Sequence, residues 1–178
     1  MLIAITWKTW SGKTTLRKNI EKHGFSSIIT TTTRSPREGE IEGIDYNFIS
    51  KDCFSPDEFA LVGRNDTGDF YGIRKNVLFS DEDKVLVTWR SWIDEIDKLV
   101  EQKILKYRNI ISVYLDFPNF TIMRRLLKRG DRKDAIRSRL RDDTKKFYWF
   151  EPKIKTIHIH EWNIQEITKI IINNILTK

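Results

Sequence analysis

Two patterns of apolar and polar residues alternate along the 178-residue chain. Short runs of apolar and β-branched residues bounded by turn-forming residues predict buried strands, and apolar residues that recur every three or four positions predict amphipathic helices. Strands are predicted at residues 2–6, 25–31, 45–49, 84–88, 110–116 and 154–159. Helices are predicted at residues 13–22, 55–62, 92–106, 119–129, 133–146 and 164–176. Because strands and helices alternate, we expect an α/β fold whose core is a mostly parallel sheet covered by helices on both faces.

Capping signals mark the ends of three of these helices. Ser91, followed by Asp94, is a candidate capping pair for the long helix in the middle of the chain. Gly130 is expected to end the next helix, because glycine adopts the left-handed conformation of a helix C-terminus. Asn163 with Glu166 is expected to cap the last helix.

The charge balance narrows the class of ligand. The chain carries 32 Lys and Arg against 25 Asp and Glu, a formal net charge of +7. Many cations lie at Arg34 and Arg37 and in the block 124–141, which favours small phosphorylated ligands over an extended nucleic-acid surface. A single cysteine, Cys53, excludes an intrachain disulfide and is expected to be buried. With no apolar run of roughly 20 residues, we expect a cytoplasmic protein without membrane or nucleic-acid partners; its oligomeric state is left open.

A partial phosphate-binding loop follows the first predicted strand. Residues 7–14 read W-K-T-W-S-G-K-T and keep the second half of the pattern G-x-x-x-x-G-K-[ST]. Between a strand and a helix, backbone N–H groups and a helix N-terminus can converge on a phosphate chain. Lys13 is then expected to contact the outer phosphates of a nucleoside triphosphate, and Thr14 to bind Mg²⁺. The other predicted phosphate-binding residues are Ser11, Gly12 and Thr15. In the alternative interpretation, Ser11 caps a helix and Lys13 is solvated.

Trp7 and Trp10 stand where such a loop uses glycine. Glycine allows unusual φ/ψ angles and close approach of a ligand, and another residue in a left-handed conformation costs roughly 1–2 kcal/mol. Three accounts stay open: the loop has lost triphosphate binding, it has rearranged with the indoles outward, or these residues are glycine in the living protein. The third is our hypothesis, because some genetic codes read as glycine a stop codon that another code reads as tryptophan. Trp89 and Trp92 also follow Thr or Ser in a context that looks natural with glycine.

The strongest motif lies at residues 30–48 and reads T-T-T-T-R-S-P-R-E-G-E-I-E-G-I-D-Y-N-F. Its two arginines, Arg34 and Arg37, can hold one phosphate with paired charge-assisted hydrogen bonds. The segment closely resembles the T-T-R-x-P-R-x-G-E-x-x-G-x-D-Y-x-F stretch of the guanylate kinase family. The resemblance implies that Arg34, Arg37 and Tyr46 bind the 5′-phosphate of a nucleoside monophosphate, with Thr30 near the base. The alternative is a solvated basic turn.

The resemblance continues along most of the chain. Residues 70–72, F-Y-G, are similar to the family's Y-Y-G-T/S, which implies that Tyr71 and Gly72 belong to the acceptor site. The stretch R-L-L-K-R-G at residues 125–130 and the later R-L pair at 139–140 are similar to the family's lid. This implies that Arg125, Arg129 and Arg139 act with Lys13 as catalytic residues that neutralise the transferring phosphoryl group. The alternative for the lid arginines is a charged helical face.

The chain departs from the family where the base is read. The family's glutamate aligns near residues 60–62, where this chain has no acid, and Ile73 replaces the hydroxyl residue after Tyr-Gly. Because a site that hydrogen-bonds polar edges discriminates far better than an apolar one, base selection is left open. Asp66 and Asp69 are candidate substitutes. The segment 85–92 also lacks the acids that the family uses near Mg²⁺ and the acceptor.

The resemblance implies one domain with a P-loop NTPase-type three-layer α/β/α fold. Its parts would be a core (1–30, 84–128 and 143–178), an acceptor-binding lobe (31–83) and an Arg-rich lid (129–142). The implied activity is transfer of the γ-phosphoryl group of ATP to GMP or dGMP with Mg²⁺. Two alternatives stay open: a catalytically impaired module of this type that binds phosphopeptides or nucleotides, and a viral-type deoxynucleoside monophosphate kinase of different base specificity.

Overall fold

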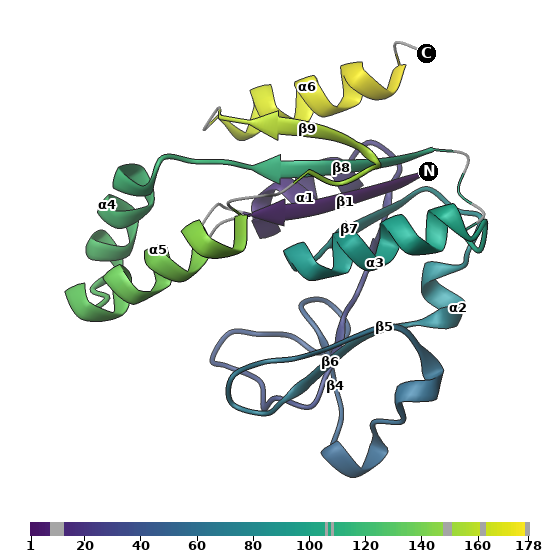
Figure 1. Cartoon of the computed structure of the whole chain (residues 1–178), viewed down its shortest axis with the longest axis horizontal. Coiled ribbons are helices and arrows are strands. Elements are labelled where there is room, and N and C mark those ends of the chain that lie inside the picture. Colours follow the sequence, from purple (N-terminus) through teal and green to yellow (C-terminus); the bar gives the residue numbers. More distant parts are fainter. Residues whose placement is uncertain (8–12, 106, 108, 148–150, 161–162, 177–178) are drawn as a thin grey trace.

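The computed structural model describes residues 1–7, 13–105, 107, 109–147, 151–160 and 163–176. A five-stranded parallel sheet forms its centre, and a four-stranded sheet lies to one side (Figure 1). The strands of the large sheet, in spatial order, are β2 (Ser26–Ile28), β7 (Lys84–Val87), β1 (Leu2–Trp7), β8 (Ile110–Leu115) and β9 (Lys155–Ile159). The helices around it are α1 (Lys13–Glu21), α3 (Arg90–Glu101), α4 (Asn119–Arg129), α5 (Lys133–Phe147) and α6 (Ile164–Leu176). This arrangement confirms the predicted α/β class with a parallel core.

Strand β1 is buried on both faces because it lies in the middle of the large sheet. Ile3 and Ile5 pack into one hydrophobic core, and Leu2 and Ala4 pack into the other. Side chains alternate across a strand, so each core receives every second residue of β1. Residues of α1, α4 and α6 complete the first core, and residues of α3 and of the smaller sheet complete the second.

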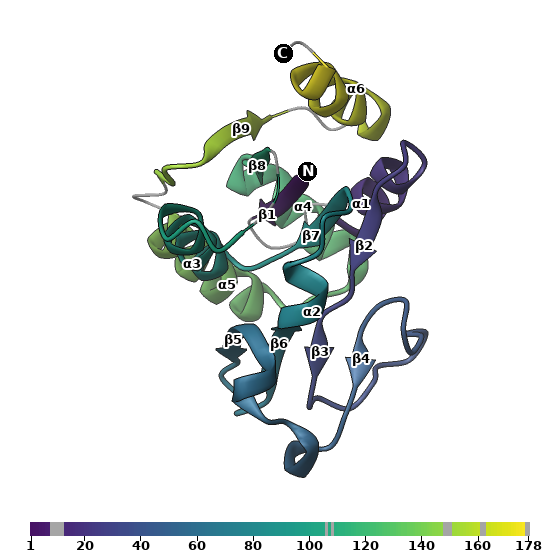
Figure 2. The same ribbon diagram turned by 90° about the vertical axis from the view of Figure 1, so that its right-hand side faces the viewer.

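The smaller sheet is built from residues 31–74 and lies below the large sheet in Figure 2. Its strands, in spatial order, are β4 (Asn47–Phe48), β3 (Thr31–Thr32), β6 (Phe70–Arg74) and β5 (Phe59–Arg64). Two short 3₁₀ turns precede β5, and a one-turn helix follows β6: η1 (Lys51–Cys53), η2 (Pro56–Glu58) and α2 (Lys75–Leu78). Strands β5 and β6 form an antiparallel hairpin.

The helix predicted at 55–62 is wrong. Only Pro56–Glu58 turn, as a 3₁₀ helix, and from Phe59 the chain continues as a strand. Phe59 and Leu61 are buried while Val62 is exposed, an alternation that belongs to a strand with one face on the core. Cys53, expected to be buried, is exposed at the end of η1.

The ends of three helices test the capping signals. Helix α3 begins before Ser91, at a boundary where Trp89 is the N-cap and makes no side-chain cap hydrogen bond, so the predicted cap from Ser91 is wrong. Gly130 ends α4 with a φ of 92°, as predicted. The Asn163 Oδ1 accepts hydrogen bonds from two backbone N–H groups of the first turn of α6, at 2.9 and 3.4 Å, which confirms that cap.

None of the helices in the described part of the chain is long and apolar enough to cross a bilayer. The α4–α5 hairpin projects beyond the carboxyl end of β8, and the smaller sheet lies on another side of the molecule (Figure 1). The division of the chain into core, acceptor-binding lobe and lid is a statement about function and stays a prediction.

Candidate functional site

The candidate site lies at the carboxyl edge of the large sheet, where β1 and β7 end and the smaller sheet faces them. Ligands of open parallel α/β sheets bind in the crevice outside this edge. Three cavities of about 290, 210 and 150 Å³ lie here. Each is lined by residues of both the large sheet's edge and the 30–74 region.

Arg34 is the centre of the predicted acceptor site. Its Nε donates to the Tyr71 hydroxyl at 3.2 Å, and its Nη2 donates to Glu40 Oε1 at 2.9 Å. The guanidinium also lies over the rings of Tyr46 and Phe48, 5.2 and 5.7 Å from their centroids. Burial works to lower the pKa of Arg34, but the hydrogen bonds to Glu40 and Tyr71 outweigh it and raise that pKa. Arg34 is therefore a fixed cation, and the fold brings it together with Tyr46 and Tyr71.

Glu40 holds the turn that carries both arginines. Its Oε2 accepts a hydrogen bond from the Arg37 N–H at 2.7 Å while its Oε1 binds Arg34. Burial works to raise the pKa of the Glu40 carboxyl, but the hydrogen bonds from Arg34 and from the Arg37 N–H lower it overall. The Arg37 side chain is exposed, and its guanidinium makes no hydrogen bond within the described residues. Its donors can therefore serve an incoming anion.

Thr30, Arg37 and Tyr46 line the cavity of about 210 Å³. Burial is the main cause that raises the pKa of the Tyr46 hydroxyl, which consequently stays protonated and can donate a hydrogen bond. Thr30 and Tyr46 also line the cavity of about 150 Å³, so these two cavities adjoin.

Tyr71 and Gly72 lie next to each other in β6. Tyr71 is 7% exposed, and its hydroxyl accepts hydrogen bonds from Arg34 and, at 3.5 Å, from the Asn65 amide. A Cβ at Gly72 would come within 2.4 Å of the Phe59 ring, so close packing of β5 on β6 needs glycine here. The part of Gly72 in acceptor binding stays a prediction.

The tip of the β5–β6 hairpin holds the two candidate base-reading acids. Asp69 Oδ2 accepts hydrogen bonds from the Thr67 hydroxyl and the Asn65 amide at 2.6 and 3.1 Å, and these lower the pKa of Asp69. Asp69 therefore fixes the turn. Asp66 is exposed, makes no hydrogen bond within the described residues and lines the cavity of about 290 Å³. Of the two acids, Asp66 is the one available to a ligand.

The predicted phosphate loop has the required structural context. Strand β1 ends at Trp7, and Lys13, Thr14 and Thr15 form the first turn of α1. A strand therefore enters the loop and a helix leaves it, as the motif demands. The predictions for Trp10, Ser11 and Gly12 fall on residues outside the described part of the chain. The roles of all these residues stay predictions.

The tryptophans at glycine-like positions have ordinary backbone angles. Trp7 ends a strand, Trp89 is extended with φ −76° and ψ 155°, and Trp92 is helical. Within the described part of the chain, Lys103 is the one non-glycine residue with a positive φ. The conformational need for glycine therefore does not hold at these three positions. The difference from glycine at these positions is therefore the volume of the indole side chain.

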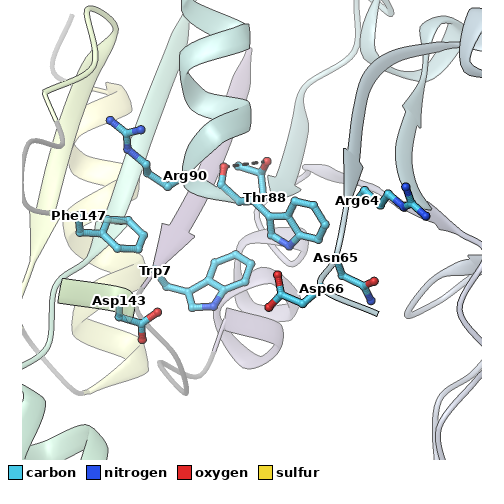
Figure 3. A pocket seen from close by; sticks show the side chains of 9 residues that line it. Trp7, Arg64, Asn65, Asp66, Thr88, Arg90, Asp143 and Phe147 are labelled. Carbon is cyan, nitrogen blue, oxygen red and sulfur yellow. Dashed lines mark hydrogen bonds between the residues drawn. The ribbon is translucent and has the colours of Figure 1, made fainter. Parts of the chain in front are cut away.

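Trp7 takes up space beside the predicted phosphate loop (Figure 3). Asp143 and Phe147 of α5 flank its indole on one side, and Asp66 lies on the other. The cavity of about 290 Å³ around it is therefore bounded by the end of β1, α5 and the hairpin tip. Trp7 also lines the cavity of about 150 Å³ with Tyr46 and Tyr71, so its indole borders both cavities.

Trp89 bridges the large sheet's edge and the smaller sheet. Its ring centroid lies 4.8 Å from that of Tyr71 and 5.3 Å from that of Trp92. Trp92 is 3% exposed, and its indole N–H has no hydrogen-bond partner within the described residues. Together with Trp7 and Tyr46, these rings line the cavity of about 150 Å³. The slot beside the acceptor residues is consequently narrow and aromatic.

The predicted lid arginines share one helical hairpin. Arg125 and Arg129 lie on α4, and Arg139 lies on α5. Arg139 forms an ion pair with Asp131 at 3.3 Å, so its charge is partly matched by the turn between the two helices. Their catalytic part stays a prediction.

Similarity to known proteins identifies the family. The family model described as guanylate kinase matches residues 7–72. A guanylate kinase of Helicobacter pylori is 36% identical over 154 residues, which cover 78% of this chain and 69% of that protein. The chain belongs to the guanylate kinase family. A guanylate kinase of Mycoplasmopsis pulmonis is 35% identical over 158 residues, covering 80% of this chain and 78% of that one. The crystal structure of guanylate kinase from Anaplasma phagocytophilum, at 21% identity, has the same fold with a TM-score of 0.65 and covers 98% of this chain and 84% of that one.

Several residues that line the cavities of this candidate site were missed by the sequence interpretation. They are Arg17, Arg64, Asn65, Asp143 and Phe147. Two of them had a signal in their spacing: Arg17 follows Lys13, and Asp143 follows Arg139, by four positions on one helix face. Asn65 begins an N-D-T-G turn whose amide oxygen accepts from the Asp69 N–H at 2.8 Å, so its turn chemistry could have been predicted.

Proposed function

We propose that the protein transfers the γ-phosphoryl group of ATP to GMP or dGMP. The observation that supports this most strongly is the Arg34 cluster, a half-buried cation fixed by Glu40 and Tyr71 at the carboxyl edge of the sheet. A guanidinium held in this way meets a phosphate monoester without first losing side-chain freedom. Membership of the guanylate kinase family supports ATP as the phosphoryl donor and a guanine nucleotide as the acceptor.

The proposed roles follow from charge. Arg34, Arg37, Tyr46 and Tyr71 bind the acceptor's 5′-phosphate, and Thr30 lies near its base. An oxygen of that phosphate attacks the γ-phosphorus in line, ADP leaves, and no residue of the chain becomes covalently modified. The charge that spreads over the transferring group is neutralised by cations, which we assign to Lys13, Arg125, Arg129 and Arg139.

Mg²⁺ is part of this proposal. Within the described residues there is no group of three or more His, Cys, Asp or Glu side chains that could hold a metal ion. Strand β7 ends at Val87, followed by Thr88, where no carboxylate is available. We therefore assign Mg²⁺ chiefly to the triphosphate oxygens, with Thr14 as its ligand from the protein, and derive no step from a carboxylate-bound metal.

A coupled assay of ADP release tests the proposal. Wild-type protein is given ATP with GMP, dGMP, AMP and the pyrimidine monophosphates in turn. Arg34→Gln and Arg37→Gln should each raise the acceptor KM roughly 10- to 100-fold, because a hydrogen bond to a charged group contributes about 1.5–3 kcal/mol. The control is Arg74→Gln, which removes an exposed arginine paired with Glu58 on the same lobe. Turnover of no monophosphate, or equal effects of Arg34→Gln and Arg74→Gln, would refute the proposal.

One set of observations favours a second function, a binding module of impaired activity. Trp7 and Trp89 line the cavities beside the phosphate loop and the acceptor residues. Activity of a Trp7→Gly, Trp10→Gly double variant but not of wild type would support recoded glycines, and inactivity of both would favour the module. Four ordinary TGG codons at positions 7, 10, 89 and 92 of the gene would end the recoding hypothesis. Preference for a monophosphate other than GMP would support the third candidate, a kinase of different base specificity; its basis is that Ile73 replaces the family's hydroxyl residue after Tyr-Gly.

A further inference from the structure

Arg17 is a buried cation outside the predicted acceptor motif. It lies in the second turn of α1, four positions after Lys13, and is 6% exposed. Arginine is almost never buried without partners that satisfy its charge, because removing an ion from water costs several kcal/mol. A buried arginine therefore needs a compensating interaction.

The described residues satisfy little of this guanidinium. Its Nη1 donates to the backbone carbonyl of Ile44 at 3.0 Å. The nearest carboxylate oxygen, Glu21 Oε1, is 4.0 Å from Nε and also accepts a hydrogen bond from the Ser27 hydroxyl. An arginine has five N–H donors. Within the described part of the chain, Arg17 consequently keeps donor capacity that no neighbour uses.

Arg17 lines the same cavity of about 210 Å³ as Arg37 and Tyr46. Of the two acids that line it, Glu40 accepts hydrogen bonds at both oxygens, and Asp45 accepts one at Oδ2, from the Ile41 N–H at 3.0 Å, which leaves Asp45 Oδ1 as an acceptor. Against this one acceptor stand the donors of Arg17, Arg37 and the protonated Tyr46 hydroxyl. Spare capacity that consists mainly of donors suits an anion.

We propose that Arg17 is a third arginine of the acceptor-phosphate site, which binds the phosphate monoester from the core side while Arg34 and Arg37 bind it from the lobe. This assignment rests on the proposed function. Because Arg17 belongs to the helix that follows the predicted phosphate loop, it draws the acceptor phosphate toward the donor's γ-phosphate. Its hydrogen bond to Ile44 holds the lobe segment that leads to Tyr46 against the same helix.

A purely structural role of Arg17 predicts a different result. If Arg17 only tied α1 to the lobe, its loss would weaken binding of the nucleoside and of the nucleotide alike. A phosphate-binding arginine contributes only when the phosphate is present. The ratio of the two affinities therefore separates the two roles.

The experiment compares dissociation constants of GMP and guanosine, measured by calorimetry or by competition, for wild type, Arg17→Gln, Arg17→Lys and Lys18→Gln. Lys18 is the matched control, because it is an exposed cation on the same helix. Arg17→Gln should weaken GMP binding by roughly 10-fold or more and guanosine binding by less than about twofold. Arg17→Lys should lie between Arg17→Gln and wild type, and Lys18→Gln should match wild type.

Equal weakening of GMP and guanosine, or no weakening of either, overturns the assignment. Should Arg17→Gln fail to fold, the Arg17→Lys variant decides alone: it keeps a charge but lacks the guanidinium fork, so an unchanged ratio refutes the proposal. Wild type that turns over GMP while the Arg17 variants keep its acceptor KM refutes this inference and leaves the proposed function intact. Wild type that neither binds nor phosphorylates GMP refutes both.

Discussion

Gly63 in β5 lies directly beneath the indole of Trp89, and Gly63→Ala tests that arrangement. A Cβ at position 63 would come within 2.4 Å of Trp89 Cζ3 and 2.9 Å of its Cε3, and 3.2 Å from Trp92 Nε1. Contacts below 3.0 Å are essentially never formed by a real Cβ. The new methyl group and the indole therefore cannot both keep their places.

The size of the effect follows from the room around the ring. Forcing an extra methyl group into a packed contact costs about 1–3 kcal/mol. With Trp89→Ala in the same chain the two closest contacts are gone and the one with Trp92 Nε1 remains, so Gly63→Ala should then be nearly neutral, because its smaller unfolded-state entropy offsets that contact. The expected coupling energy between the two positions is thus about 1–3 kcal/mol.

The assay is equilibrium unfolding in urea for the four proteins of this double-mutant cycle. Gly63→Ala should lower the free energy of unfolding in the presence of Trp89 and not in its absence. If Gly63→Ala is as stable as wild type, or destabilises both backgrounds equally, Trp89 does not pack on β5 as described.

Three further perturbations test the charges and the helix ends. Glu40→Gln removes a carboxyl group whose pKa is lowered overall: burial tends to raise it, but the hydrogen bonds from Arg34 and the Arg37 N–H outweigh burial. Such a group stabilises the fold above its unfolded pKa and loses that contribution as pH falls through its folded pKa. Between about pH 6 and 3, the Tm should therefore fall less steeply for the variant than for wild type. Asp97→Ala leaves two backbone N–H groups, now bonded at 2.8 and 3.0 Å, without their acceptor and should cost about 1–3 kcal/mol for each group in urea unfolding; the exposed Glu95→Ala on the same helix is the control, and equal effects would contradict this role. Gly130→Ala forces a left-handed φ on alanine and should cost about 1–2 kcal/mol, a fall in Tm of roughly 2–8 °C; an unchanged Tm would show that the α4–α5 turn relaxes freely.

The middle of the large sheet was predictable because its three inner strands, β7, β1 and β8, are apolar on both faces. The run 2–6 is apolar at nearly every position, and it becomes β1 almost without change of bounds. The smaller sheet was harder, because its strands are short and half-polar. At Phe59 the apolar pattern covers only a few residues and follows a turn rich in acids, so the periods of a helix and a strand could not be told apart.

The residues of the candidate site likewise fall into those that the sequence predicts and those that it does not. The motif at 30–48 predicted the acceptor residues because their side chains are close in sequence, and Arg34 indeed meets Glu40 six residues later. Arg17 and Asp143 were missed because only the folded arrangement brings α1 and α5 to the cavities that residues of the lobe also line. Spacing along one helix can indicate a shared face, but it cannot say which distant segment that face will meet.

The place of β1 in the large sheet has a consequence for how the chain matures. Leu2 pairs with Lys84 on one side and with Ile110 on the other. During synthesis, the first strand therefore has to wait for more than half of the chain to leave the ribosome before its backbone groups find their partners, and such long-range pairing is slow. Until then an apolar N-terminal segment is exposed to other nascent chains. A chaperone that shields this segment should therefore improve the yield of folded protein, and should do so more than a mutation that slows unfolding of the finished protein.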